Sequence, residues 1–458
     1  MSQEDLKKTQ EHDCDNSHLD IFTQEPDSPV LKTVKRKNTE YRYTKMSNFV
    51  LRLSRFYAPM PMWKLAAITS GLAVIFGVIS VFFVKNPGIY NFGAAAFGQS
   101  TARLTNVLLR DNVNITPEIY NVIDHALFWI LYIVLSTPVF IFGWKKAGKV
   151  FTLLTLLFLG ISSLVSFGIG QIPGSGKLYI IGNFEHNTIP AELKSYITTN
   201  YWGNKSQMWS LIPLDWNDAG NVIAQMIFGV VYGILLAYFF AVIAIIGGSA
   251  GVTGIIGEYM SVVKRKNFGT MNGYINLGIL TVAVLVGSYL PGSLLIDAIA
   301  SNGVEQWKLL AQNIAPDDIY KQGKIIETLS QLKSLAWSPS MYFSPNLVST
   351  LISNFVFVYS LNKLFPRFKV VQCKVYSPHM SAIKAAIIGD QKTINSFTIT
   401  VGEGGYSGSK TKVLSSITLY KQVPRLIKKI RAVDKNALIT ISNVASVDGR
   451  LYLPNNKF

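Results

Sequence analysis

The sequence contains few of the residues that build disulfide frameworks, metal centres or soluble domains. It has only two cysteines, Cys14 and Cys373, far apart and without a CxxC spacing, which excludes a disulfide scaffold and a structural zinc site. Its five histidines are scattered. No paired carboxylates, Ser-His-Asp arrangement or metal cluster can be placed on facing elements, so we expect neither an enzyme nor a bound cofactor. Charged residues make up only 15% of the chain, against about 25% in soluble globular proteins. The sequence therefore predicts a membrane protein whose first partner is the lipid bilayer.

The formal net charge of +17 is carried by tails and short connections rather than by a binding surface. No stretch interleaves aromatic residues with a basic stripe, so nucleic acid is not expected as a partner. Residues 1–60 begin acidic and polar and turn basic from Lys32 to Arg55. We expect this segment to be disordered, with its basic part lying against anionic lipid. The first apolar run begins only near Met62, so a cleaved secretory signal is not expected.

Six segments are long and apolar enough to cross a hydrocarbon core, which needs about 20 residues. They are Trp63–Val84, Asp124–Gly143, Val150–Gly170, Val222–Ile246, Tyr274–Ile296 and Leu347–Leu361. The last is diluted by Thr350, Ser353 and Asn354, which indicates an inward-facing helix, because such side chains hydrogen-bond between spans.

Basic residues fix the expected orientation of these spans. Lysines and arginines cluster at 145–149, 264–266 and 363–369, which places these turns in the cytoplasm by the positive-inside rule. The membrane domain of residues 61–366 then has outer loops at about 172–220 and 297–346. We therefore expect a protein of the plasma membrane with both termini in the cytoplasm.

Two runs of small residues stand at corresponding places in the two halves of the membrane domain. NPGIYNFGAAAFGQS, Asn86–Ser100, follows the first span, and GGSAGVTG, Gly247–Gly254, follows the fourth. We call them the first and second breaks. Because three crossings separate them, the halves would have opposite orientations. This 3+3 inverted repeat is typical of secondary transporters, which bind solutes at the repeat interface.

The second break supplies the candidate binding residues for an unidentified small solute. They are Gly247, Gly248, Ser249, Gly251 and Thr253, with polar contributions from Glu258 and Asn276. A second interpretation remains open, since small residues in membrane helices also serve plain backbone packing. Glu258 is open in the same way: it faces a cavity, or it pairs with Lys264 or Arg265 at the membrane surface.

Residues 367–458 change to short alternating strands and predict a cytoplasmic α+β domain. KVVQCKVY, NSFTITV, KVLSSITLY and ALITISNV are strand-like, and two helical segments separate them in the order βαββαβ of a ferredoxin-like sandwich. The run GEGGYSGSK between the second and third strands is either a hairpin turn or an anion-binding loop. As a loop site it would use Gly402, Gly404, Gly405, Tyr406 and Lys410.

The chain resembles the YitT family of bacterial membrane proteins, which join six spans to a small cytoplasmic domain. In the membrane half the resemblance rests on Leu135–Leu156, on GVTGII and on GYINL. In the tail it rests on GEGGYSGSKTKVL and DKNALITISNVASVDG. The family usually has Gly-Gly-Thr-Asp where this chain has Gly251, Val252, Thr253 and Gly254, so the acidic residue is missing.

The residues and the resemblance together predict a permease for a small solute, with a tail that senses a cytosolic metabolite or forms a homo-oligomer. The alternative is a membrane-anchored sensor or scaffold, in which the spans only hold the tail and its glycine loop binds an anionic metabolite or partner.

Overall fold

A computed structural model describes most of the chain outside its N-terminal segment. The described residues are 60–109, 117–170, 172, 174–175, 178–184, 211–264, 266–311, 327, 330–331, 333–365, 369–389, 396–404, 408 and 410–446. Pro61–Lys363 forms one compact unit, the membrane unit, and the described part of Leu364–Phe458 belongs to another, the tail domain.

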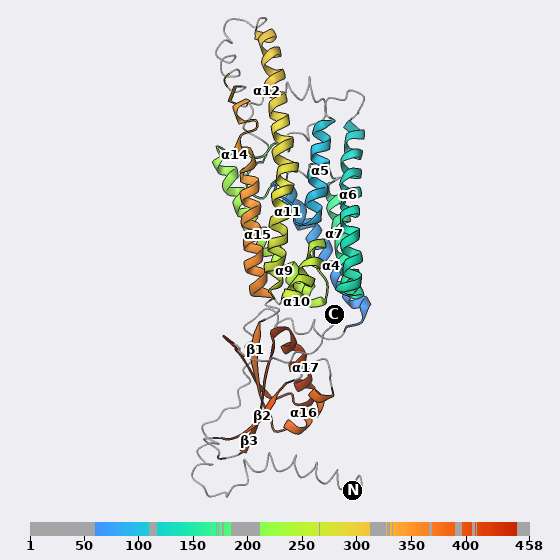
Figure 1. Cartoon of the computed structure of the whole chain (residues 1–458), viewed down its shortest axis with the longest axis vertical. Coiled ribbons are helices and arrows are strands. Elements are labelled where there is room, and N and C mark those ends of the chain that lie inside the picture. The colour runs from blue at the N-terminus through green and yellow to red at the C-terminus, as the bar shows by residue number, and fades with distance from the viewer. Residues whose placement is uncertain are drawn as a thin grey trace. The chain divides into compact units, whose positions relative to one another are not determined.

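The membrane unit is entirely helical in its described part (Figure 1). Its elements are α4 (Met62–Ser80), the π-helical turn η2 (Val81–Lys85), α5 (Ala94–Leu108), α6 (Pro117–Lys146), α7 (Lys149–Gly170), α9 (Ala219–Ile246), α10 (Val252–Lys264), α11 (Phe268–Val284), the π-helical turn η6 (Leu285–Tyr289), α12 (Leu290–Ala311), α14 (Pro339–Tyr342) and α15 (Pro345–Leu364).

Five helices of the described part are long and apolar enough to cross a membrane: Met62–Lys85, Lys149–Gly170, Ala219–Ile246, Phe268–Ser301 and Pro339–Leu364. Each covers one of the predicted spans. The remaining predicted span lies within the 30-residue helix α6.

The polar residues of α15 face the interior of the bundle, as the sequence predicts. Thr350 and Ser353 are fully buried and Asn354 is 4% exposed. Their neighbour Ser349 donates a hydrogen bond of 2.7 Å from its hydroxyl to the carbonyl oxygen of Gln225 on α9. Interhelical bonding of this kind explains why a span of modest hydropathy is still a membrane helix.

Two features of the membrane unit differ from the prediction. Each break leads into an additional helix, α5 or α10, which the sequence did not reveal because both are short and rich in small or polar residues. The helix from Phe268 also continues through α12 to Ala311, so the first part of the predicted outer loop 297–346 is helical.

Glycines bring two pairs of helices into close contact. A Cβ at Gly77 of α4 would lie 2.8 Å from the carbonyl oxygen of Ser162 and 2.9 Å from the Cβ of Val165 on α7. A Cβ at Gly233 of α9 would lie 2.6 Å from the carbonyl oxygen of Ser353 and 3.0 Å from the Cβ of Val356 on α15. In both pairs the glycine faces a serine carbonyl and a valine three residues later.

We expect Gly77→Ala and Gly233→Ala each to destabilise the protein by about 1–3 kcal/mol, because the added methyl group meets a backbone atom that cannot move aside. Gly71 on α4 and Gly220 on α9 are the matched controls, since a Cβ there meets nothing within 4 Å. Alanine at the controls should be neutral or mildly stabilising. Unfolding of the detergent-purified protein measures the difference, and equal effects at contact and control glycines would contradict the close packing.

The described tail domain is a four-stranded antiparallel sheet with two helices on one side (Figure 1). Its elements are β1 (Val370–Tyr376), α16 (Met380–Ile388), β2 (Thr398–Glu403), β3 (Lys410–Leu419), the 3-10 turn η8 (Tyr420–Gln422), α17 (Val423–Val433) and β4 (Leu438–Asn443). The strands lie in the order β2-β3-β1-β4, and the element order along the chain is the predicted βαββαβ.

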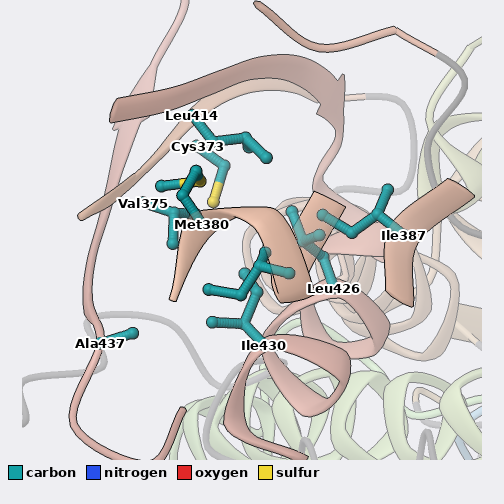
Figure 2. Packing of buried hydrophobic residues seen from close by; sticks show 9 residues of the cluster. Cys373, Val375, Met380, Ile387, Leu414, Leu426, Ile430 and Ala437 are labelled. Atoms are coloured by element: carbon teal, nitrogen blue, oxygen red, sulfur yellow. The ribbon is translucent and has the colours of Figure 1, made fainter. Parts of the chain in front are cut away.

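The core of the tail domain lies between the sheet and the two helices (Figure 2). Alternate residues of β1 point inward, and Cys373 and Val375 are fully buried. They pack with Leu414 of β3, Ile383 of α16 and Leu426 of α17. The inward-facing side chains of the strands, which recur at every second residue, thus pack against the apolar faces of both helices.

Cys373 should resist thiol reagents in the folded protein. Burial raises the pKa of its thiol to about 12, so almost none is the reactive thiolate at pH 8. In a Cys14→Ser variant, in which Cys373 is the sole cysteine, we expect labelling by a maleimide only after denaturation. Rapid labelling of the native protein at pH 8 would show that the core is open.

At the end of α17 the Asp434 carboxylate ties this helix to the chain after β1. It accepts a hydrogen bond of 2.6 Å from the Ser377 hydroxyl and one of 2.8 Å from the backbone N–H of Asn436. Burial raises the pKa of the Asp434 carboxyl, but these hydrogen bonds and the nearby His379 outweigh burial and hold the pKa below its usual range.

Candidate functional site

The second break begins where α9 ends. Gly247 adopts the left-handed conformation with φ of +104°, and the backbone N–H groups of Gly247 and Gly248 both donate to the carbonyl oxygen of Ile243. This glycine-dependent ending stops the helix and turns the chain. The prediction of a non-helical segment holds for Gly247–Gly251, whereas Thr253 and Gly254 belong to α10.

Ser249 fastens the second break to α7. Its backbone N–H donates a hydrogen bond of 2.9 Å to the hydroxyl oxygen of Thr155, which itself donates to the carbonyl oxygen of Phe151 at 2.8 Å. The Ser249 side chain is fully buried and bonds to the backbone of Gly251. Gly248 fits closely as well, since a Cβ there would lie 3.2 Å from the Cβ of Leu154.

The first break is fastened to α15 in the same way. The backbone N–H of Tyr90 donates a hydrogen bond of 3.1 Å to the hydroxyl oxygen of Thr350, which donates to the carbonyl oxygen of Asn346 at 2.7 Å. The Asn346 amide also donates to the carbonyl oxygen of Gly88 at 2.9 Å. Gln225 of α9 donates to the carbonyl oxygen of Pro87 at 2.5 Å.

These contacts are reciprocal. Thr155 lies on the last helix of the first half and holds the break of the second half, whereas Thr350 lies on the last helix of the second half and holds the break of the first. Each threonine hydroxyl donates to the carbonyl four residues earlier and accepts a backbone N–H from the break of the other half. One backbone N–H of each break is therefore bonded to the other half.

The two breaks meet at Gly93 and Thr253. Gly93, just before α5, has φ of +75° and ψ of −155°, and a Cβ there would lie 2.8 Å from the Thr253 hydroxyl oxygen. The same hydroxyl lies 3.4 Å from the side-chain oxygen of Asn276 on α11. We call this place the junction. It joins α5 and α10, the two helices that the sequence did not reveal.

Aromatic rings surround the junction. Phe92 stacks on Tyr232 of α9 and Phe357 of α15, with ring centroids 6.1 and 6.2 Å apart. Phe240 of α9 meets Phe357 edge to face at 5.0 Å, and a Cβ at Gly251 would lie 3.2 Å from the Phe240 ring. The junction is therefore a closely packed place in which aromatic rings surround a few polar groups.

Glu258 lies inside the membrane unit, on α10 one turn beyond Gly254. It is 4% exposed, whereas Lys264 is exposed and Arg265 lies outside the described residues. Ser261 donates from its hydroxyl to the Glu258 carbonyl oxygen at 2.7 Å. Across the described ranges, no group of three or more His, Cys, Asp or Glu residues could hold a metal ion.

The glycine run of the tail domain connects β2 to β3. Gly402 lies in β2 opposite Thr411 of β3, and Glu403 lies opposite Lys410, so both ends of the predicted loop belong to the sheet. The N–H of Gly408 donates to the carbonyl oxygen of Gly404 at 2.7 Å. Gly405 and Tyr406 lie outside the described residues. This geometry is that of a hairpin connection, and the role of the predicted loop site stays a prediction.

The sequence identified Thr350 as an inward-facing residue but not its partner, and it did not identify Thr155, because a hydroxyl on an apolar span carries no signal that names its partner. Gly93 was within the first break but was not singled out. Asn272 was missed as well, although it stands four residues before Asn276 in the same apolar helix, and this spacing places both on one face.

Comparisons with known proteins find relatives whose sequences align with almost the whole chain. It is 30% identical over 418 residues to the "Uncharacterized protein MG443" of Mycoplasma genitalium, covering 90% of this chain and 94% of that protein. It is 29% identical over 409 residues to the "Uncharacterized protein MG432" of the same organism, with 89% and 92% covered. A protein of Spiroplasma citri, "Uncharacterized protein in fibril gene 3'region", is 23% identical over 270 residues, with 57% and 63% covered.

Within the tail, residues 395–449 match the family model described as "Uncharacterized protein conserved in bacteria (DUF2179)". No solved structure matches the chain.

Proposed function

The chain belongs to the same family as the uncharacterized protein MG443 of Mycoplasma genitalium, and from that premise we propose that it is a plasma-membrane permease of the YitT type. In this proposal a small solute passes between two inverted halves of three spans each. The first half contains α4, α6 and α7, and the second contains α9, the helix through α11 and α12, and α15. The match of residues 395–449 to the DUF2179 family model supports the YitT resemblance.

The observation that best supports the proposal is that each break is hydrogen-bonded to a threonine of the other half. Thr155 and Thr350 occupy the seventh position of α7 and the sixth position of α15, and each accepts a backbone N–H from the other half's break. The glycine contacts repeat the correspondence, since Gly77 packs on α7 as Gly233 packs on α15. Such paired contacts support an inverted repeat, and transporters of this architecture bind solutes where broken helices of the two halves meet.

Within this proposal the second break forms one wall of the solute site and the first break forms the other. Gly247, Gly248, Ser249 and Gly251 position the backbone of the second break. Thr253 and Asn276 face the solute with polar groups at the junction, and Glu258 provides a buried carboxyl nearby. In this proposal the chain crosses the membrane six times, so both termini lie in the cytoplasm on the same side as the basic turns.

The tail is a ferredoxin-like domain in this proposal and regulates the permease through a cytosolic metabolite or through assembly with other copies. The observed strand order β2-β3-β1-β4 and the element order βαββαβ support this fold.

Uptake by purified protein in liposomes tests the proposed function. Vesicles with the full chain and protein-free vesicles are incubated with a mixture of small metabolites, and their contents are compared by mass spectrometry after rapid washing. We expect at least one solute to enter only the protein-containing vesicles. Its rate of entry should increase with the amount of protein in the vesicles. If all solutes enter both vesicle types equally, and depletion of the protein leaves cellular uptake unchanged, the permease proposal is wrong.

A further inference from the structure

Two buried asparagines lie one turn apart on α11, and a third contacts the same turn from α15. Asn272 and Asn276 belong to that turn and are 1% and 3% exposed. Asn354 of α15 is 4% exposed and donates from its amide to the carbonyl oxygen of Gly273 at 3.3 Å. With about 100° of rotation per residue, positions 272, 273 and 276 fall within a sector of roughly 100°. We call this group the amide cluster.

The oxygen atoms of the amide cluster are poorly satisfied. Among the described residues, neither polar atom of the Asn272 side chain has a hydrogen-bond partner, and neither does the side-chain oxygen of Asn354. The oxygen of Asn276 has only the long contact of 3.4 Å with the Thr253 hydroxyl. Unsatisfied buried polar groups are costly, so such a concentration points to a ligand.

The neighbouring helix α10 is shaped to admit the Asn272 side chain. A Cβ at Gly257 would lie 2.5 Å from the Asn272 side-chain oxygen and 3.4 Å from its nitrogen. Any larger residue at 257 would displace this amide. Glu258 follows directly on α10 and is itself buried.

The chemistry of these donors selects the ligand. Free amide oxygens attract a positive charge, and a set of neutral oxygens suits a monovalent ion, whereas Ca²⁺ and Mg²⁺ are usually held by carboxylates. Sodium sites in membrane transporters are likewise built at broken helices from oxygen ligands.

We propose that the side-chain oxygens of Asn272, Asn276 and Asn354 bind a dehydrated monovalent cation between α10, α11 and α15. Na⁺, K⁺ and ammonium share this chemistry, and the experiment distinguishes them. The inference goes beyond the permease proposal, because it concerns ion binding and is read without any uptake.

Thermal unfolding of the full chain in detergent tests the site. The protein is prepared in choline chloride, and choline is exchanged for Na⁺, K⁺ or ammonium at constant ionic strength while tryptophan fluorescence reports Tm. We expect one of the three to raise Tm in a saturable way, because a ligand that binds only the folded state stabilises it. No ion-specific shift would overturn the proposal and would leave the amides with ordered water alone.

Substitutions in the amide cluster locate the effect. Asn272→Ala should abolish the ion-dependent shift, and Asn272→Asp, which adds a charge in the same shape, should lower the half-saturating concentration about tenfold or more. Asn217→Ala, at an exposed asparagine, is the matched control and should keep the wild-type shift. If Asn272→Ala does not fold, Asn354→Ala takes its place. A wild-type shift in Asn272→Ala or Asn354→Ala, or an unchanged affinity in Asn272→Asp, would overturn the assignment.

The two proposals fail separately. An ion-dependent Tm without uptake of any solute would count against the permease alone. Uptake with no ion-dependent Tm would count against the cation site alone.

Discussion

Replacing Gly93 with alanine is expected to destabilise the membrane unit by about 2–5 kcal/mol, the sum of two effects at one position. The backbone at Gly93 has φ of +75° and ψ of −155°, a region open essentially to glycine alone. The added methyl group would also lie 2.8 Å from the Thr253 hydroxyl oxygen and 3.1 Å from its methyl carbon. Both effects act where the two breaks meet.

A double-mutant cycle separates the backbone effect from the steric effect. Thr253→Ala removes the atoms that the new methyl group would meet, so Gly93→Ala should cost less in that background. About 1–3 kcal/mol should remain, because the backbone conformation still disfavours alanine. Gly278→Ala on α11 is the control, since a Cβ there meets nothing within 4 Å. Unfolding in detergent gives all the values. If Thr253→Ala leaves the cost of Gly93→Ala unchanged, the two breaks do not meet at this contact.

Apolar runs made the long helices of the membrane unit predictable, because a span must be apolar over its whole length. A search for long apolar runs misses α5 and α10, because neither helix is long and apolar throughout. The run AAAFGQSTARLTNVL of α5 combines small residues with Gln99, Arg103 and Asn106, and such a composition looks like a loop until the neighbouring helices cover it. Length and hydropathy therefore located the spans, and small residues located the breaks, but neither signal revealed the helices that follow the breaks.

The tail domain was predictable in element order because short strands and amphipathic helices each carry their own period. In the folded domain the alternation of β1 puts Cys373 inside, where Leu426 and Ile430 of α17 pack in the same core. The strand ends were less predictable. Gly402 and Lys410 belong to the sheet because pairing between β2 and β3 extends past the point where the alternating pattern stops.

The contacts that hold the two breaks lay beyond sequence reasoning. Thr155 and Ser249 are 94 residues apart, and Tyr90 and Thr350 are 260 residues apart. A threonine on an apolar helix satisfies its own hydroxyl by donating to a carbonyl one turn earlier, so nothing local reveals that it also accepts a distant backbone N–H. Only the structure shows that each threonine accepts a backbone N–H from the break of the opposite half.

The central claim is that each half hydrogen-bonds the break of the other half and that a solute passes between them. Uptake by variants of Thr155 and Thr350 tests this claim most directly. Thr155→Val and Thr350→Val keep the side-chain shape but leave a backbone N–H of the opposite break unsatisfied, at a cost of about 1–3 kcal/mol. Thr137→Val is the matched control, because the Thr137 hydroxyl is exposed and also donates to the carbonyl four residues earlier.

With the solute found in the liposome screen, uptake per protein should fall about fivefold or more in both Thr155→Val and Thr350→Val, since 1 kcal/mol corresponds to roughly that factor. Thr137→Val should transport at the wild-type rate. Wild-type uptake in both Thr155→Val and Thr350→Val, or a loss in Thr137→Val as large as theirs, would contradict the account.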